Sequence, residues 1–399
     1  MGSVELLPVG RRVAYWRGRR KLSQQVFADR LGKSKSWVDK VERGVRRLDK
    51  LSTLQEIARV LRIDAAALVG QDAAPVKPTN RGDGVDRIRA ALSRYEIPLG
   101  KREGGPVVPV DRMLRDVGYA WTTFQYARYS QVIDLASTLL VNAQRTHAEA
   151  SESGRASLVE AYRITAALLV KLGDAALAWL AVDRAMLAAT GDRELVAAAA
   201  VQLGQVLRAL GRAREAKSVM LTAAYRIAPP VIEYGAPVEL SLCGTLLIQA
   251  SLAAAQDGNE SAAGELLNEA AGMAAQVGDG CDHYRTAFGP TAIDVARAAV
   301  FVENGDTDEA IAWHEKATAR AGWRWLPAEH RAAHLLDMAR AYLHSGDVGN
   351  AARMLTEAER TAPSEITHRP AARDILAEVA RDPRAPTTIA KLAGTLGVG

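Results

Sequence analysis

A glycine that recurs five times, with alanine at fixed distances after it, is the strongest constraint on the fold of this 399-residue chain. Each of these glycines is followed by alanine five and twelve residues later, and a small residue lies seven residues before it. They are Gly173, Gly211, Gly258, Gly305 and Gly346, which are 38, 47, 47 and 41 residues apart. Self-similarity with a period of this length indicates an array of repeated supersecondary units.

The residues around each glycine have helical periodicity, so each unit is predicted to be a pair of helices, A and B, joined at the glycine. Glycine makes this turn because it adopts positive φ without steric cost, and the small residues let neighbouring helices approach closely. Six or so pairs are expected between residues 111 and 383. Within that range, residues 113–143 are predicted to form an earlier, more divergent unit and residues 367–383 a capping helix, followed by a tail over residues 384–399.

This pattern resembles the tetratricopeptide repeat (TPR), lengthened by a few residues per unit and with most of the Trp and Tyr signature positions degenerate. The resemblance implies an all-α, TPR-like α-solenoid in which the A helices line a concave groove. A wall of mixed apolar and polar side chains suits an extended peptide, whose backbone amides need hydrogen-bond partners. A solvated groove without a ligand remains the alternative. The residues predicted to line a ligand-binding groove are Arg163, Lys171, Gln205, Arg208, Arg340 and His344.

A second motif, LSQQVFADRLGKSKSWVDKVERG, lies near the N-terminus. Ser23 is a good N-cap for one short helix, Gly32 ends that helix, and Ser34 is a good N-cap for the next. Val38 and Val41 are enough to bury one side of the second helix, which leaves its polar residues free to face outward. Two short helices joined by a tight glycine turn form a helix-turn-helix, whose second helix can lie in the major groove of DNA.

The motif resembles the helix-turn-helix family that includes phage repressors and the xenobiotic-response-element (XRE) regulators. The matching positions are Leu22-Ser23-Gln24, Ala28, Leu31-Gly32, Ser34, Ser36 and Glu42-Arg43-Gly44. The resemblance covers roughly residues 9–70 and implies an N-terminal helix-turn-helix bundle that binds double-stranded DNA. The residues expected to contact DNA are Gln24, Lys33, Lys35, Ser36, Trp37, Asp39, Lys40 and Arg43, with Arg19 and Arg20 of the first helix as phosphate contacts.

Three of these assignments leave alternatives open. Trp37 occupies a position at which the family usually has a small residue, so it either packs against the scaffold or contacts a thymine methyl group or a sugar. Asp39 would repel phosphates, so it either accepts a hydrogen bond from a cytosine amino group or pairs with Lys35 or Lys40. The arginines of the first helix either bind phosphates or are ordinary solvated charges.

Charge is distributed unevenly along the chain. Residues 1–72 contain 16 Lys and Arg against 8 Asp and Glu, a net charge of +8, and the remaining residues contain 35 against 38, a net charge of −3. A basic domain attached to a mildly acidic body predicts a polyanionic partner for that domain. The predicted organisation is a DNA-binding domain over residues 1–70, a linker over residues 71–110, and the array. The linker contains one amphipathic helix, residues 85–96, which either packs on the array or makes a dimer contact.

Other functional classes have little support. The longest apolar runs fall short of the roughly 18 residues of a membrane span, and the N-terminus lacks the order of a signal peptide. His330 and His334 have the i, i+4 spacing of a zinc helix, but the intervening glutamate and a third ligand are missing. Cys243 and Cys281 follow no metal spacing. We therefore expect neither cofactor nor metal, and no enzymatic activity.

Together these features predict a cytoplasmic, sequence-specific transcription regulator. The order of its domains is similar to that of the peptide-pheromone-sensing (RRNPP-type) regulators, which join this helix-turn-helix to TPR-like repeats. The resemblance implies a homodimer on a palindromic operator, a role in quorum sensing, and a peptide as the signal. A small-molecule signal and an interaction scaffold that holds a protein partner at DNA are the alternatives. The high Ala, Arg and Gly content is typical of a GC-rich actinobacterial genome.

Overall fold

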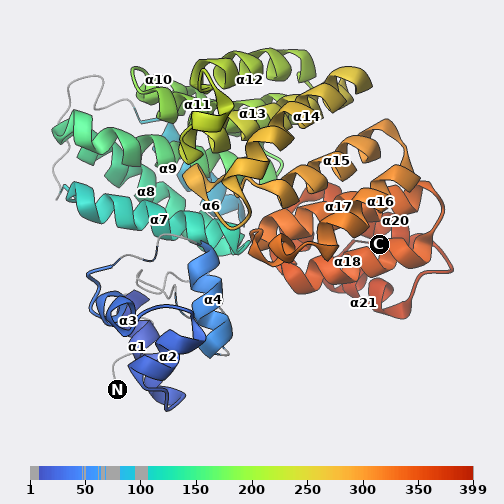
Figure 1. Cartoon of the computed structure of the whole chain (residues 1–399). Helices are drawn as coiled ribbons and strands as arrows, with labels where there is room; N and C mark the ends of the chain where they lie inside the picture. Colours follow the sequence, from blue (N-terminus) through green and yellow to red (C-terminus); the bar gives the residue numbers. More distant parts are fainter. Residues whose placement is uncertain are drawn as a thin grey trace. The chain divides into compact units, whose positions relative to one another are not determined.

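The computed structural model describes residues 9–46, 48, 51–61, 63, 68, 81–94 and 107–398, which contain helices and no strand. The chain divides into two compact units. The first unit is Met1–Thr79 together with Gly280–Asp282, and the second is Asn80–Asp279 together with His283–Gly399. The predicted all-α fold is confirmed, and each unit is described by itself below (Figure 1).

The first unit is a small helical bundle. Its helices are α1 (Val9–Arg19), α2 (Gln24–Arg30), α3 (Lys35–Glu42) and α4 (Leu51–Leu61). The buried side chains of α1, α2 and α3 include Val13, Phe27 and Val38, none of which is exposed to solvent. α1 crosses α3 so closely that a Cβ atom on Gly10 would lie 2.0 Å from the carbonyl oxygen of Val41. Only glycine fits at this crossing, because the obstructing atom belongs to backbone.

The second unit is an array of antiparallel helix pairs, which lie side by side in Figure 1. The pairs are α7 (Val110–Gln125) with α8 (Tyr129–Glu149), α9 (Ser151–Lys171) with α10 (Ala175–Ala189), α11 (Arg193–Ala209) with α12 (Ala213–Ile227), α13 (Pro237–Gln256) with α14 (Glu260–Val277), α15 (Pro290–Asn304) with α16 (Thr307–Ala319), and α17 (Ala328–His344) with α18 (Val348–Thr361). Three short 3-10 helices join some of them: η2 (Ile232–Tyr234), η3 (His283–Arg285) and η4 (Ala321–Trp325). The prediction of about six helix pairs is confirmed.

The five repeat glycines make the turns between the A and B helices. All five have φ between +74° and +80°, the left-handed region that favours glycine. The alanine five residues after each glycine is completely buried, which allows the paired helices to pack closely. These alanines are Ala178, Ala216, Ala263, Ala310 and Ala351. Packing is closest at Gly204, where a Cβ atom would lie 2.0 Å from Cε of Met220 on the facing helix.

Four of the five turns share a second signal. The residue after the glycine is Asp or Asn, and its side chain accepts a hydrogen bond from the backbone N–H three residues later, as at Asp174, Asn259, Asp306 and Asp347. Each of these side chains caps a B helix and satisfies one of its free N–H groups. In the remaining turn Arg212 follows the glycine and makes no side-chain cap. The Gly-Asp/Asn dipeptide therefore both ends one helix and begins the next.

The segments on either side of the pairs also pack on the array. Helix α6 (Arg81–Leu92) falls within the predicted linker, but its side chains Ile88 and Leu92 are fully buried and it packs on α8. Of the two roles considered for this helix, the structure shows packing on the array. The chain ends in α19 (Pro363–His368), α20 (Pro370–Arg381) and α21 (Thr387–Leu396). Residues 384–399, predicted to be a tail, thus contain a helix, and Ile389 of that helix is buried.

Helix α13 is the central core helix of the array. In the part of the chain that the structure describes, it is the one helix with the length and apolar composition to cross a membrane, and 78% of that apolar window is buried. A Cβ atom on its Gly244 would lie 2.1 Å from the ring of Phe288. The apolar composition of α13 is explained by its burial between α12, α14 and α15.

The array curves until its last helices contact its first. α17 contacts α7, and α19 contacts α8. One hydrophobic cluster contains Leu140 of α8 and Ile164 of α9 together with Leu336 of α17 and Leu376 of α20. Helices more than 150 residues apart in the sequence therefore share a core.

Candidate nucleic-acid interface and repeat groove

Local sequence signals position the two helices of the candidate nucleic-acid interface. The Oγ atom of Ser23 accepts a hydrogen bond of 3.2 Å from the backbone N–H of Val26 at the start of α2. The Oγ atom of Ser34 accepts one of 3.1 Å from the N–H of Trp37 at the start of α3. Between the helices, Gly32 has φ +61°. Both predicted caps and the predicted glycine turn are present, so the geometry follows from three short-range signals.

A buried polar network fastens α3 to α1 and α2. The guanidinium of Arg17 on α1 donates to both carboxylate oxygens of Glu42, at 2.5 and 3.0 Å. The side-chain amide of Gln24 donates to Glu42 Oε2 at 2.8 Å. Arg17 also donates to the carbonyl oxygen of Leu22 at 2.6 Å. The side chain of Glu42 is 7% exposed, so nearly all of its hydrogen-bonding capacity is directed inward.

This network was missed from the sequence, and it changes the role expected of Gln24. The amide nitrogen of Gln24 donates its hydrogen bond to Glu42, so Gln24 links α2 to α3. The signal that could have revealed the network is the position of Glu42, one residue after Val41 on the buried side of α3. A carboxylate at a buried position requires a cationic partner, and Arg17 is the residue of α1 that reaches it.

The outward face of α3 carries the cationic side chains predicted to meet DNA. Lys35, Ser36 and Lys40 are exposed along the helix, with Lys33 just before it and Arg43 just after it. The guanidinium of Arg43 lies 3.4 Å from the carboxylate of Asp39, one turn away. Asp39 therefore pairs with Arg43 and not with Lys35 or Lys40, which corrects that alternative. Lys35 has the same four-residue spacing from Asp39, so the choice of Arg43 depends on side-chain conformation and not on spacing alone.

Trp37 is half-buried, and the guanidinium of Arg46 lies 5.9 Å from the centre of its ring. The tryptophan thus packs partly against the scaffold and supports a further cation beside the exposed face of α3. Its backbone N–H is the one that Ser34 caps. Trp37 consequently occupies the first turn of α3, beside the positions that point outward.

The two arginines of the first helix differ from each other. Arg20 donates from Nε to the carbonyl oxygen of Leu61 at 2.9 Å, at the C-terminal end of α4. Arg20 therefore stabilises the end of that helix as well as carrying charge. Arg19 is exposed, lies 5.9 Å from the ring centres of both Tyr15 and Trp16, and donates to the Tyr15 hydroxyl at 3.1 Å. Arg19 is the freer of the two to bind a phosphate.

Comparison with protein families identifies this unit. Residues 8–69 match the family model described as a helix-turn-helix domain. The predicted resemblance of the N-terminal motif is confirmed on the residues that carry it, with α2 as the supporting helix and α3 as the second helix of the motif.

Three solved structures are similar to this chain at low identity. BtubC from P. vanneervenii is 20% identical, covering 60% of this chain and 90% of that chain, with a TM-score of 0.37. PlcR from Bacillus thuringiensis, in complex with the peptide PapR7 and DNA, is 15% identical, covering 78% and 99%, with a TM-score of 0.34. The apo form of the competence regulator ComR from Streptococcus vestibularis is 13% identical over 100% of both chains, with a TM-score of 0.20. A search of curated proteins finds no match.

Outside the helix-turn-helix domain, the predicted groove residues differ in accessibility. Arg163 is 1% exposed and engaged within the array. It donates to Gln202 Oε1 at 2.7 Å and to the carbonyl oxygen of Tyr284 at 3.0 Å, it pairs with Glu160, and its guanidinium lies 5.4 Å from the ring centre of Trp121. The structure thus places Arg163 in the core and not on an open groove.

Three of the other predicted groove cations face partly solvated space. Arg208 donates to the side-chain oxygens of Gln249 and Gln256, both at 3.1 Å. Arg340 donates to Glu303 at 2.6 Å. The ammonium of Lys171 contacts two carboxylates. Of the remaining positions predicted to line the groove, Gln205 is partly exposed and His344 is exposed.

The interior charges influence one another. Burial raises the pKa of the Asp337 carboxyl, although the nearby Arg369, Arg340 and Arg208 favour its charged form. Burial also lowers the pKa of Arg208 despite the nearby Glu303 and Asp337. Cations and anions from α11, α15 and α17 therefore lie close enough to interact. This arrangement can hydrogen-bond a ligand that carries both donors and acceptors.

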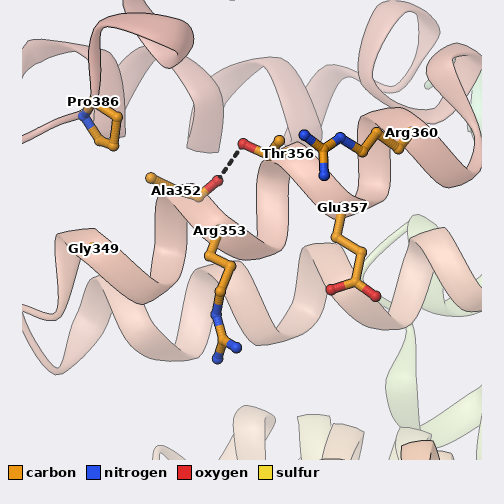
Figure 2. Close-up of a pocket in the computed structure, with 7 residues that line it drawn as sticks. All are labelled: Gly349, Ala352, Arg353, Thr356, Glu357, Arg360 and Pro386. Atoms are coloured by element: carbon orange, nitrogen blue, oxygen red, sulfur yellow. Dashed lines mark hydrogen bonds between the residues drawn. The ribbon is translucent and has the colours of Figure 1, made fainter.

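A surface cleft of about 450 Å³ lies elsewhere, along α18 (Figure 2). Its lining includes the exposed side chains of Arg353, Glu357 and Arg360, and Pro386 borders it. In Figure 2 the hydroxyl of Thr356 hydrogen-bonds the backbone carbonyl of Ala352, at 2.8 Å. None of the groove positions predicted from the sequence lines this cleft.

The histidines considered as zinc ligands have other partners. Nε2 of His334 lies 2.9 Å from Nδ1 of His314, and His334 is 2% exposed. The His330 ring instead contacts Glu329, at 2.9 Å. Among the described residues there is no group of three or more side chains that could hold a metal ion. Neither Cys243 nor Cys281 forms a disulfide bond within the described residues, and burial raises the pKa of the Cys243 thiol to about 12.

The buried histidine pair predicts acid sensitivity. Burial, together with His314, lowers the pKa of His334 to about 3. Because the unfolded chain binds this proton near pH 6.5, stability is full above that pH and is lost as the pH falls toward 3. Between pH 7 and pH 5 we expect His334 to cost the array about 2 kcal/mol of unfolding free energy. Urea unfolding at both pH values measures this difference.

A His334→Gln variant should show a shallower loss between pH 7 and pH 5, because the buried group no longer titrates. His344→Gln, which removes an exposed histidine, is the matched control and should keep the wild-type slope. An unchanged slope in His334→Gln would show that other groups cause the acid sensitivity.

Proposed function

We propose that this protein is a sequence-specific transcription regulator that binds double-stranded DNA through α3. The observation that carries the proposal is the cationic outward face of α3, anchored from behind by the Arg17–Glu42–Gln24 network. Lys35 and Ser36 begin the helix, where side chains of a recognition helix reach base edges in the major groove. Lys33, Lys40, Arg43 and Arg19 contribute charge for phosphates. The proposal makes the chain a cytoplasmic, nucleoid-associated regulator and not an enzyme.

A single substitution tests the choice of recognition helix. We expect Lys35→Ala to weaken specific binding by about tenfold or more, since a good base contact is worth roughly 1–3 kcal/mol. Gel shifts and a footprint on the DNA upstream of the gene measure the effect. Lys391→Ala, an exposed lysine in α21, is the matched control and should bind as wild type. Specific binding that survives Lys35→Ala unchanged would argue against α3 as the reading helix.

The proposed assembly is a homodimer on a palindromic operator. Dimers of this motif bind two half-sites about one helical turn, roughly 34 Å, apart. The same footprint should therefore show two protected half-sites related by inverted symmetry. Sedimentation at the concentrations of the gel shift reports the oligomeric state, and a monomer that protects a single half-site would contradict the dimer.

For the array, we propose signal binding on the inner face of the A helices, with a peptide as the first candidate. Support comes from the mixed cationic, anionic and amide side chains at Arg208, Arg340, Asp337 and Gln249. A peptide backbone presents donors and acceptors that such a surface can satisfy. Gel shifts with and without culture extract test this role. Protease treatment of the extract separates a peptide from a small molecule, and an extract that never alters DNA binding would favour a scaffold.

A further inference from the structure

The first and last parts of the array share a hydrophobic cluster and a group of buried polar contacts. α19 contacts α8, and α17 contacts α7. The turn that ends α9 lies against the start of α20, since a Cβ atom on Gly173 would be 2.8 Å from the ring of Pro370. These contacts join residues nearly 200 positions apart in the chain.

Two buried carboxylates and a lysine whose side chain is 16% exposed lie at this junction. The ammonium of Lys171, at the end of α9, lies 2.6 Å from Glu365 Oε1 on α19 and 2.8 Å from Glu329 Oε2 on α17. The buried Tyr129 hydroxyl on α8 donates to the same Oε1 atom of Glu365. Arg369 lies 3.6 Å from Glu365 Oε2. One lysine near the start of the array thus compensates two carboxylates near its end.

The junction depends on this compensation. Glu365 is completely buried, and its Oε2 atom has no hydrogen-bond donor within the described part of the chain. Burial alone would lower the pKa of Lys171, but Glu329 and Glu365 outweigh it and raise the pKa. Burial alone would raise the pKa of Glu329, but His330 and Lys171 hold it well below its usual range. Removing the lysine would take away the cation that Glu329 and Glu365 share, and would leave each carboxylate with one neighbour, His330 or Arg369.

We propose that Lys171, Glu329 and Glu365 form a latch that fastens the end of the array to its beginning, and that the array opens when Lys171 disengages. Adjacent repeats keep their own apolar contacts in the open state, because each pair packs mainly on its neighbours. Opening therefore separates the two ends and exposes the apolar side chains through which they share a cluster, without unfolding the helices, as in other two-state rearrangements of packed elements. If the groove binds a peptide, as proposed above, the open state is the one that admits it.

Distances between spin labels on the full-length protein test the latch. Ala176 on α10 and Ala371 on α20 are exposed positions on opposite sides of the junction, and each is replaced by cysteine in a Cys281→Ser background. Cys243 is buried and stays. We expect one short-distance population in the parent and a second, longer-distance population that exceeds it in Lys171→Met. Circular dichroism should show the same helix content in both.

A neutral triple variant separates charge from packing. Lys171→Met combined with Glu329→Gln and Glu365→Gln removes every charge of the latch, and we expect it to return to the short distance. Arg320→Met is the matched control, because it also takes a cation from a buried carboxylate, Asp294, but within neighbouring elements. It should keep the parent distance.

Three results would overturn the latch: a Lys171→Met variant that shows only the short distance, loss of its helix content, or a triple variant as open as Lys171→Met. Since the measurement uses no ligand, failure here leaves the proposed signal-binding function standing.

Discussion

An Arg163→Met variant is expected to lose about 3–5 kcal/mol of the unfolding free energy of the array, the usual cost of removing one partner from a buried ion pair. Arg163 is 1% exposed, and its guanidinium donates hydrogen bonds to Glu160, Gln202 and the Tyr284 carbonyl. Methionine fills a similar volume but donates nothing, so three acceptors lose their partner in a low-dielectric interior. Urea unfolding followed by circular dichroism measures the loss.

The array contains a well-matched control for this substitution. Arg212 also pairs with a glutamate three residues away and also lies 5.4 Å from a tryptophan ring centre, but it is on the surface. Arg212→Met should cost less than about 1 kcal/mol, because exposed ion pairs contribute little. Equal losses in the two variants would mean that burial does not determine the value of Arg163.

A Glu42→Ala variant is expected to destabilise the helix-turn-helix domain by about 3 kcal/mol, the lower end of the range for a broken buried ion pair, because Arg17 keeps some contact with solvent. A domain of about 60 residues has roughly 3–9 kcal/mol of stability in total. The loss therefore unfolds a measurable fraction of the domain and weakens DNA binding with it. Hydrogen exchange over residues 9–42 should report faster exchange there, with the array unaffected.

Asp39→Ala is the control for Glu42→Ala, because it removes a carboxylate from the same helix but from an exposed i, i+4 pair. We expect it to change the exchange of the domain by less than about 0.5 kcal/mol. The double variant Arg17→Met with Glu42→Leu should recover much of the lost stability, since it leaves no unpaired charge. Normal protection in Glu42→Ala would show that apolar packing alone holds α3 in place.

Short-range sequence signals determined much of the architecture. Ser23, Gly32 and Ser34 specify the helix-turn-helix locally, because a cap or a positive φ acts within three or four residues. The repeat glycines do the same for the array, for example Gly173, whose φ of +79° ends α9. Periodicity then identified the helix pairs, since each buries one face against its neighbour.

Predictions that depended on position along a helix were less successful. Arg163 and Arg208 were both predicted to line the groove, yet Arg163 is in the core and Arg208 is partly exposed. The two side chains differ in exposure because different segments pack over them. Arg163, for example, is covered by the segment of Tyr284, 121 residues away, whose carbonyl accepts its hydrogen bond. Asp39 shows the same problem on the surface of α3. The cations Lys35, Lys40 and Arg43 were all near it in the sequence, and the side-chain conformations pair it with Arg43.

What the sequence alone determined is therefore the set of local structures: a helix-turn-helix, its basic outward face, and a series of glycine-turned helix pairs. Only the tertiary structure decided which charges meet. Glu42 joins Arg17 across 25 residues and Glu365 joins Lys171 across 194. The physical reason is that caps and turns are satisfied by neighbours in the chain, whereas a buried charge is satisfied by whichever partner the packing of distant helices brings to it.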